Sequence, residues 1–203
     1  MIGEKPIRTI STREVYKNPW CRVREDVVER ALAHGQQRGI YGVMDKDPAC
    51  IVIPIEHALE GDFVWLVRQY RYTVDGTYYE LPQGGWEDAE VDPEELARGE
   101  LAEETGFRAE RMVPLADLWI AYGAMRQIHH VYLAEGLSAG ETQRDPEEHD
   151  MTVHRVAVSE FEAMMLDGRV MDNCTVAAWG LYRVWKERRI DAVMRREALR
   201  LVE

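Results

Sequence analysis

Residues 93–105 restrict the fold of this chain more than any other stretch, because they carry a complete set of helix signals. Asp92 can cap the first turn, and Pro93 suits the first helical position. Gly106 suits the left-handed residue that ends many helices. The sequence therefore predicts one helix over residues 93–105.

Three glutamates, Glu100, Glu103 and Glu104, are spaced i, i+3 and i+4 on this predicted helix. Such a spacing places the three carboxylates on one helix face, where they repel one another unless a cation neutralises them. Mg²⁺ prefers oxygen ligands from a few carboxylates and leaves other positions to water and substrate phosphates. The spacing favours a magnesium site, with Mn²⁺ as a second candidate; the alternative is a solvated acidic face.

Residues 84–107 resemble the Nudix box, the signature of the Nudix hydrolase superfamily. The box consists of Gly, five residues, Glu, seven residues, Arg-Glu, an apolar residue, any residue, Glu-Glu, any residue, Gly and an apolar residue. The matching positions are Gly84, Glu90, Glu100, Leu101, Glu103, Glu104, Gly106 and Phe107. The resemblance implies an α+β Nudix fold, with a mixed β-sheet sandwiched between helices and a strand-rich N-terminal extension.

The chain departs from the box in two places. One extra residue separates Glu90 from Glu100, and Gly99 stands where the box has its arginine. Arg98 points about 100° away from that position, because a helix has 3.6 residues per turn. In the family this arginine holds a glutamate in place. Its loss affects the tuning of the site, and a repositioned Arg98 or another basic group is the candidate replacement.

The composition limits the classes of protein to which this chain can belong. Its 203 residues are 46% hydrophobic and 31% charged, which is typical of a soluble globular protein. We found no stretch that resembles a membrane span or a signal peptide, so we expect a cytoplasmic protein without a membrane partner. A net charge of -12 argues against a nucleic-acid partner. The three cysteines are far apart and indicate buried thiols in a reducing compartment.

Residues 1–45 form a strand-rich extension before a catalytic domain at residues 46–203. The runs 15–28 and 39–44 favour strands, interrupted at Asn18-Pro19-Trp20. The extension resembles that of the ADP-ribose pyrophosphatase branch of Nudix enzymes, where it helps to form a homodimer and contributes an aromatic wall to the nucleotide pocket. Trp20 is the candidate for that wall, and an ordinary packing tryptophan is the alternative.

Four candidate substrate and metal contacts lie between the extension and the helix. Residues 50–55 and 63–70 predict a hairpin, which leads to Arg71 and then to Glu80-Leu81-Pro82-Gln83-Gly84. These segments resemble those of the nucleoside-diphosphate-sugar hydrolases. The resemblance implies that Arg71 binds the diphosphate and that a carbonyl near Gln83 or Gly84 is a further metal ligand. Glu80 is a weaker substrate-binding candidate, and a surface ion pair is the alternative for Arg71.

Further candidates follow the helix. Gln127 replaces a glutamate found in many ADP-ribose enzymes and is a candidate for a hydrogen bond to the substrate. Residues 137–150 are polar and acidic. In the resembling enzymes this loop holds a glutamate that acts on the attacking water, a place matched best by Glu147, with Glu148 beside it. A solvated charged loop is the alternative.

The C-terminal third predicts a strand at residues 151–158 and three helices. The first helix, at residues 160–166, has Ser159 as its expected cap and Gly168 as its end. The second covers residues 172–188, and the third is a short helix at residues 190–203.

The chemistry that these features favour is metal-assisted hydrolysis of a diphosphate. Glu100 and Glu104 are the expected main ligands, with Glu103 shared between metals or acting through water. The resemblance implies a nucleoside diphosphate linked to another moiety as substrate, first ADP-ribose, which would yield AMP and ribose 5-phosphate. One alternative is a hydrolase of another nucleotide sugar or nucleotide derivative. Another is a catalytically impaired Nudix fold that binds nucleotides or regulates a partner.

Overall fold

The structure is a computed structural model, and it describes residues 6–33, 35–85, 91–142 and 150–200, with side chains described up to residue 191. The chain divides into two compact units. The first comprises Met1–Pro48, Trp86–Ala89 and Trp119–Ile128, and the second comprises Ala49–Gly85, Glu90–Leu118 and His129–Glu203. The expected domain boundary after residue 45 remains a prediction.

The first unit is an antiparallel meander of three long strands, extended by one short strand. The sheet order is β1-β2-β3-β9, and β9 runs parallel to β3. The strands are β1 (Ile7–Lys17), β2 (Arg22–Leu32), β3 (Gly35–Asp45) and β9 (Met125–Arg126). The predicted strand-rich character of the N-terminal segment is confirmed.

The predicted interruption at Asn18-Pro19-Trp20 is the turn between β1 and β2. The side chain of Asn18 accepts hydrogen bonds from the backbone N–H groups of Trp20 at 3.0 Å and Cys21 at 2.7 Å. Asparagine often stabilises a turn in this way, because its side chain can satisfy backbone donors close by. The expected run at residues 15–28 is therefore two strands of a hairpin.

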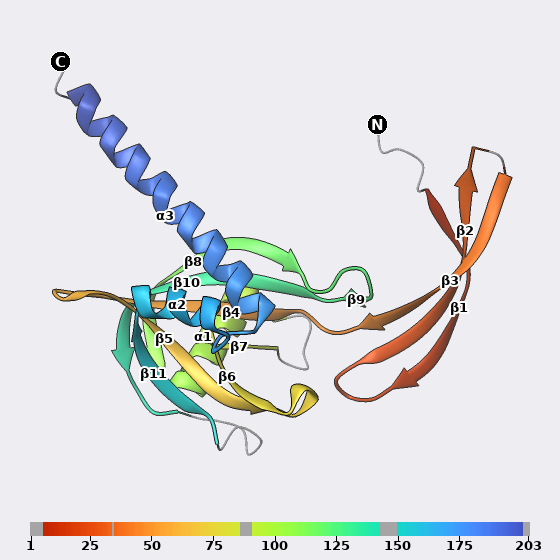
Figure 1. The fold of residues 1–203 in the computed structure, drawn as a ribbon, viewed down its shortest axis with the longest axis horizontal. Helices are drawn as coiled ribbons and strands as arrows, with labels where there is room; N and C mark the ends of the chain where they lie inside the picture. Colours follow the sequence, from red (N-terminus) through yellow and green to blue (C-terminus); the bar gives the residue numbers. More distant parts are fainter. Residues whose placement is uncertain (1–5, 34, 86–90, 143–149, 201–203) are drawn as a thin grey trace. The chain divides into compact units, whose positions relative to one another are not determined.

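The second unit is built on a seven-stranded mixed sheet (Figure 1). Five strands follow the order β11-β5-β4-β10-β8, while β6 pairs with β5 and β7 pairs with β4. The strands are β4 (Ala49–Ala58), β5 (Gly61–Arg71), β6 (Gly76–Glu80), β7 (Gln83–Gly84), β8 (Phe107–Trp119), β10 (Ile128–Ala139) and β11 (Thr152–Ala157). A short 3-10 turn, η1 (Tyr72–Val74), connects β5 to β6. The predicted hairpin of residues 50–55 and 63–70 is confirmed as β4 and β5.

Strand β4 is the centre of the core. It pairs with antiparallel β5 and with parallel β10, and its first seven residues are all buried. A strand with neighbours on both sides and both faces covered is expected to be apolar throughout. The run Cys50-Ile51-Val52-Ile53 fits this rule, with each residue at most 1% exposed.

Three helices complete the second unit. They are α1 (Pro93–Thr105), α2 (Val158–Asp167) and α3 (Asn173–Arg200). Helices α1 and α3 pack against β4, and α2 packs against β5 and β11. The predicted α+β fold class is confirmed. Among the described residues, no helix combines the length and the apolar character needed to cross a membrane.

Two details of the C-terminal third were predicted wrongly. Helix α2 begins at Val158 after an extended Ala157, which offers no capping side chain, so Ser159 is not the cap. Pairing of β11 with β5 continues to Ala157 and sets where the helix can begin. The expected short helix at residues 190–203 is instead a continuation of α3 as far as Arg200. No glycine or proline occurs after Gly180 to end that helix.

Candidate metal and diphosphate site

The helix predicted at residues 93–105 has these bounds in the structure, as α1. The Asp92 carboxylate accepts hydrogen bonds from the backbone N–H groups of Glu94 at 2.9 Å and Glu95 at 3.2 Å. At the other end, Gly106 has a φ of 76° and its N–H donates to the Ala102 carbonyl. These caps satisfy backbone groups that a helix end would otherwise leave unpaired.

The three glutamates of α1 are not equally placed. Glu100 is 6% exposed and Glu104 is 1% exposed, whereas Glu103 is only half-buried. Positions i and i+4 lie one above the other on a helix, so Glu100 and Glu104 share the face directed at the sheet. Ionised carboxylates are rarely buried unless they are paired or bind a metal. This face therefore has the donor atoms of a metal site.

Strand β7 lies directly against these carboxylates. The Gln83 backbone N–H donates to Glu104 Oε2 at 3.2 Å, and a Cβ atom on Gly84 would lie 2.4 Å from Glu100 Oε2. Gly84 pairs with Cys50 of β4, which fixes β7 in the sheet. A side chain at position 84 would force the Glu100 carboxylate to move, so glycine lets β7 approach that carboxylate closely.

We predict that replacing Gly84 with alanine displaces the Glu100 carboxylate and lowers turnover about 100-fold, because misplacement by about 1 Å has a cost of this order. Steady-state kinetics at several metal concentrations measure the effect, and the metal concentration for half-maximal rate should rise. Gly180→Ala is the matched control, because a Cβ there meets no atom within 4 Å. Unchanged kinetics in Gly84→Ala would contradict this placement of Glu100.

A second group of charges surrounds the side chain of Gln83. Its Nε2 donates to Glu80 Oε2 at 3.1 Å and to Asp172 Oδ2 at 2.9 Å. Glu80 also accepts two parallel hydrogen bonds from Arg71, from Nε at 3.0 Å and from Nη2 at 2.5 Å. Glu80 is 3% exposed, while the Arg71 side chain is 40% exposed. The ion pair thus has a buried acid and a partly exposed arginine side chain.

The pKa of Arg71 responds to the carboxylates around Gln83 and also to one carboxylate of α1. Burial lowers the pKa of Arg71, but the hydrogen bonds and the charge of Glu80 outweigh burial and raise it overall. The charges of Glu104 and Asp172 also raise this pKa. Arg71 therefore stays protonated, and of the α1 glutamates Glu104 contributes to the field around it.

Cys50 is close to the α1 carboxylates but has a different chemical character. Burial raises the pKa of its thiol well above the ordinary value, and the charges of Glu100 and Glu104 raise it further. A thiol must lose its proton to bind a metal or act as a nucleophile. Cys50 is therefore a packing residue, and the oxygen atoms of the glutamates suit a hard cation such as Mg²⁺.

The fit to a metal rests on Glu100, Glu104 and the cradle at Gly84. Within the described ranges, no three His, Cys, Asp or Glu side chains are gathered closely enough to form a metal cage by themselves. Sites for Mg²⁺ commonly take one or two carboxylates and complete the shell with water and substrate oxygens. The two buried glutamates fit such a site, and the metal roles of Glu103, Gln83 and Gly84 remain predictions.

Several sequence candidates fall elsewhere in the molecule. Trp20 is 63% exposed and lines a hollow of about 270 Å³ within the first unit. In the same unit, Gln127 Nε2 donates to the Asp47 carbonyl at 2.9 Å. The structure describes the two units separately, so the substrate roles of Trp20 and Gln127 remain predictions. Glu147 and Glu148 lie outside the described residues.

The Arg98 side chain contacts its own helix and the neighbouring strand β8. Its Nε and Nη2 pair with Glu94 at 3.0 and 2.9 Å, and its Nη1 donates to the Ala109 carbonyl at 2.9 Å. These contacts hold α1 to itself and to β8. A repositioned Arg98 is therefore not the replacement for the arginine that Gly99 displaces. Helix α1 continues through Gly99, although a mid-helix glycine costs about 1 kcal/mol relative to alanine.

Sequence reasoning missed two features. Asp172, which contacts Gln83, was visible only as the first residue of the helix predicted at residues 172–188. In the first unit, exposed aromatic residues surround a hollow of about 380 Å³, whose lining includes Tyr41, Trp119 and Tyr122. Their spacing along the chain carries no periodic signal, so only the folded sheet could reveal this aromatic group.

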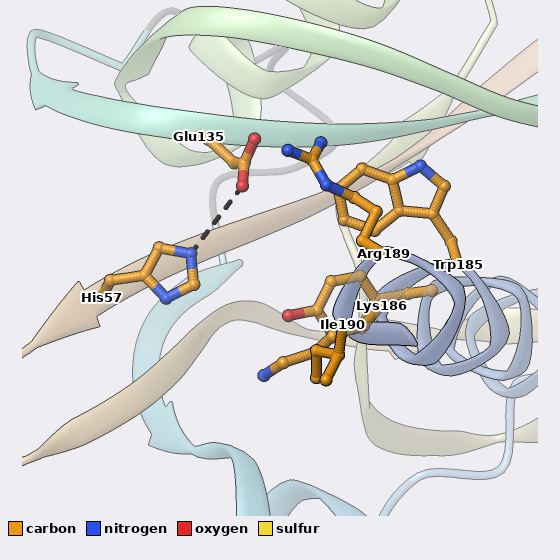
Figure 2. A pocket seen from close by; sticks show the side chains of 7 residues that line it. His57, Glu135, Trp185, Lys186, Arg189 and Ile190 are labelled. Carbon is orange, nitrogen blue, oxygen red and sulfur yellow. Dashed lines mark ion pairs between the residues drawn. The ribbon is translucent and has the colours of Figure 1, made fainter. Parts of the chain in front are cut away.

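A further concavity of about 340 Å³ lies between α3 and the sheet of the second unit (Figure 2). The Arg189 guanidinium lies 4.7 Å from the centre of the Trp185 ring. Two other basic side chains already contact an acid: Lys186 Nζ lies 2.7 Å from Asp62, and His57 Nδ1 lies 2.6 Å from Asp62. Among the described residues, Glu135 is the one acidic residue that lines this concavity, so it lacks the two buried carboxylates that make the site at α1 a candidate for a metal.

Comparisons with known proteins agree with this geometry. The NUDIX domain family model matches residues 46–174, and the model of the nucleoside diphosphate sugar hydrolase N-terminal domain matches residues 7–44. A methanol dehydrogenase activator of Bacillus methanolicus is 30% identical over 84% of this chain and 89% of its own length. An ADP-ribose pyrophosphatase of Bacillus subtilis is 29% identical over 78% of this chain and 82% of its own.

A solved structure shows the same fold. The crystal structure of an ADP compounds hydrolase matches with a TM-score of 0.76 and 20% identity, covering 93% of this chain and 98% of that one. The NUDIX match includes α1 with its buried glutamates and the strands that hold them. From the box, the fold and these matches together, the chain belongs to the Nudix family.

Proposed function

We propose that this protein hydrolyses the diphosphate bond of a nucleoside diphosphate linked to another moiety, with ADP-ribose as the first candidate substrate and AMP and ribose 5-phosphate as products. The observation that carries the proposal is the buried pair Glu100 and Glu104, held against the glycine cradle of β7. The similarity to an ADP-ribose pyrophosphatase supports the choice of substrate.

The charge balance supports a metal-dependent reaction. Arg71 is the cation of a group that also contains the carboxylates of Glu80, Asp172 and Glu104. A diphosphate would add further negative charge, which like charges nearby make unfavourable. A bound Mg²⁺ or Mn²⁺ would neutralise the diphosphate and activate a water molecule for attack on phosphorus.

The residues of the chain then have separate roles in the proposal. Glu100 and Glu104 would hold the cation, and Glu103, half-buried on the same helix, would be shared between metals or act through water. Arg71 binds phosphate oxygens with the donors that Glu80 leaves available, since a planar guanidinium has five N–H groups. Glu147 takes the proton from the attacking water, with Glu148 as the alternative base.

Two alternatives have specific support. The match of residues 7–44 to the nucleoside diphosphate sugar hydrolase N-terminal domain favours another nucleotide sugar as substrate. The similarity to a protein named as an activator of methanol dehydrogenase, together with Gly99, favours a regulatory module with impaired catalysis. We rank the regulatory module last, because a protein without catalysis gains nothing from burying two carboxylates on one helix face.

A substrate panel separates these functions. We would measure product release from ADP-ribose, nucleotide sugars and dinucleoside diphosphates, with Mg²⁺, with Mn²⁺ and with EDTA. Turnover of one compound that EDTA abolishes is the expected result and names the substrate class. Tight binding of a panel compound without turnover would instead support the regulatory module.

We also propose a cytoplasmic homodimer that binds neither nucleic acid nor membrane. The free thiols of Cys21, Cys50 and Cys174 and the net charge of -12 support the compartment and the absence of polyanion binding. Exposed apolar side chains on β1 and β3, such as Val15 and Ile40, support association through the first unit. A monomer in sedimentation experiments at micromolar concentration would contradict the dimer.

A further inference from the structure

We infer that Asp172 and the Gln83 side chain form a positioning pair, which orients Arg71 for the diphosphate through Glu80. This inference rests on the proposed function, and it gives a role to two side chains that no other part of that function uses. The four residues are linked in series by the hydrogen bonds Asp172–Gln83, Gln83–Glu80 and Glu80–Arg71.

Asp172 is anchored at the first turn of α3. Its Oδ2 accepts a hydrogen bond from the Thr175 N–H at 2.8 Å, and its Oδ1 accepts one from the Cys174 N–H at 3.3 Å. The Thr175 hydroxyl in turn accepts the backbone N–H of Leu81 at 3.0 Å, and Thr175 is fully buried. The first turn of α3 is thereby fixed to the segment that carries Glu80 and Gln83.

The Gln83 amide joins two carboxylates. Its nitrogen lies 3.1 Å from Glu80 Oε2 and 2.9 Å from Asp172 Oδ2. Only the NH₂ end of an amide can donate to two carboxylates, so the orientation of this side chain is determined. The same residue donates its backbone N–H to Glu104. Gln83 therefore holds the acid that orients Arg71 and also contacts a proposed metal ligand.

A helix cap alone would not need this arrangement. Capping requires an acceptor for the first N–H groups of α3, and a serine hydroxyl also provides one. The additional bond from Gln83 to Asp172 Oδ2 links α3 to Glu80, which otherwise has Arg71 as its cationic partner. Without Gln83, the hydrogen-bond partner that Glu80 keeps among the described residues is Arg71, and the guanidinium loses the fixed support that directs it toward the diphosphate.

Two single variants and their combination test the pair. Asp172→Ser keeps a capping acceptor but is too short to reach Gln83 as well. Gln83→Met keeps the length of the side chain and the backbone N–H to Glu104 but removes both amide donors. We expect each variant to raise the KM about tenfold with little change in kcat. This effect is smaller than the roughly 100-fold loss that a misplacement of about 1 Å can cause. The double variant should raise the KM no further than the worse single variant, because the two residues act through one link.

Asp92→Ser is the matched control, since it makes the same substitution at the cap of α1 and should leave the KM unchanged. A purely structural role predicts a lower Tm with an unchanged KM in Gln83→Met, and that result would overturn the inference. The inference would also be overturned if the KM of the double variant rose by the product of the factors found for Asp172→Ser and Gln83→Met. If the wild type is active and either of these results is found, the positioning inference fails but the proposed function stands. An inactive wild type contradicts the proposed function and the inference together.

Discussion

Replacing Glu104 with glutamine is expected to lower kcat by roughly a thousandfold while the protein remains folded. Metal-assisted charge stabilisation contributes several kcal/mol to such a reaction, and about 4 kcal/mol corresponds to this loss in rate. Glutamine has nearly the same shape and keeps an oxygen that can accept the Gln83 N–H, so the packing of this 1% exposed residue survives. Steady-state kinetics and circular dichroism measure the two parts of the prediction.

Glu95→Gln provides the control for Glu104→Gln. It makes the same chemical change on the same helix, but Glu95 is exposed in the first turn of α1. We expect its kcat to match the wild type. A Glu104→Gln enzyme that turns over at the wild-type rate, with its fold intact, would remove Glu104 from the metal site.

Replacing Arg71 with alanine is expected to raise the KM by roughly 10- to 100-fold, because a charge-assisted hydrogen bond contributes about 1.5–3 kcal/mol. The same change should lower the Tm, since it leaves Glu80, 3% exposed, without its cationic partner. Breaking a fully buried pair costs about 3–5 kcal/mol, and the cost here is smaller because Arg71 is partly exposed. Enzyme kinetics and thermal unfolding separate the two effects.

The double variant Arg71→Ala with Glu80→Gln distinguishes binding from stability. A neutral glutamine at position 80 removes the unpaired buried charge, so the Tm should recover while the KM stays high. Arg68→Ala is the control on the same strand, where the guanidinium lies 5.6 Å from the Tyr79 ring centre. If the KM recovered together with the Tm, Arg71 would be a structural partner of Glu80 and would not be a phosphate ligand.

Local signals in the sequence were sufficient to predict the bounds of α1 and the glutamates that share one of its faces. Its cap at Asp92, its end at Gly106 and the spacing of Glu100 and Glu104 all involve residues within one or two helical turns. Such signals act through backbone hydrogen bonds between near neighbours, so they do not depend on how the rest of the chain folds. The hairpin of β4 and β5 was predictable for the same reason, since a short turn joins two apolar runs.

Contacts between residues far apart in the chain could not be predicted from the sequence. Gln83 and Asp172 are 89 positions apart, and their hydrogen bond exists because β7 and α3 both pack against β4 and the first turn of α3 is bonded to Leu81. The expected cap at Ser159 failed because strand pairing, rather than the best capping residue, decided where α2 begins. Sheet register is set by the packing of the whole core, and a local pattern does not contain it.

The sequence by itself thus determined helix α1 and the glutamates that share one of its faces, and its box indicated the Nudix family that the comparisons show. Only the tertiary structure decided that Glu100 and Glu104 are buried while Glu103 is half-buried, and that hydrogen bonds link Arg71 to Glu80, Glu80 to Gln83 and Gln83 to Asp172. The physical reason is the range of the interactions. Helix periodicity fixes which carboxylates share a face, but their burial and their partners depend on strands that pack against that face from elsewhere in the chain.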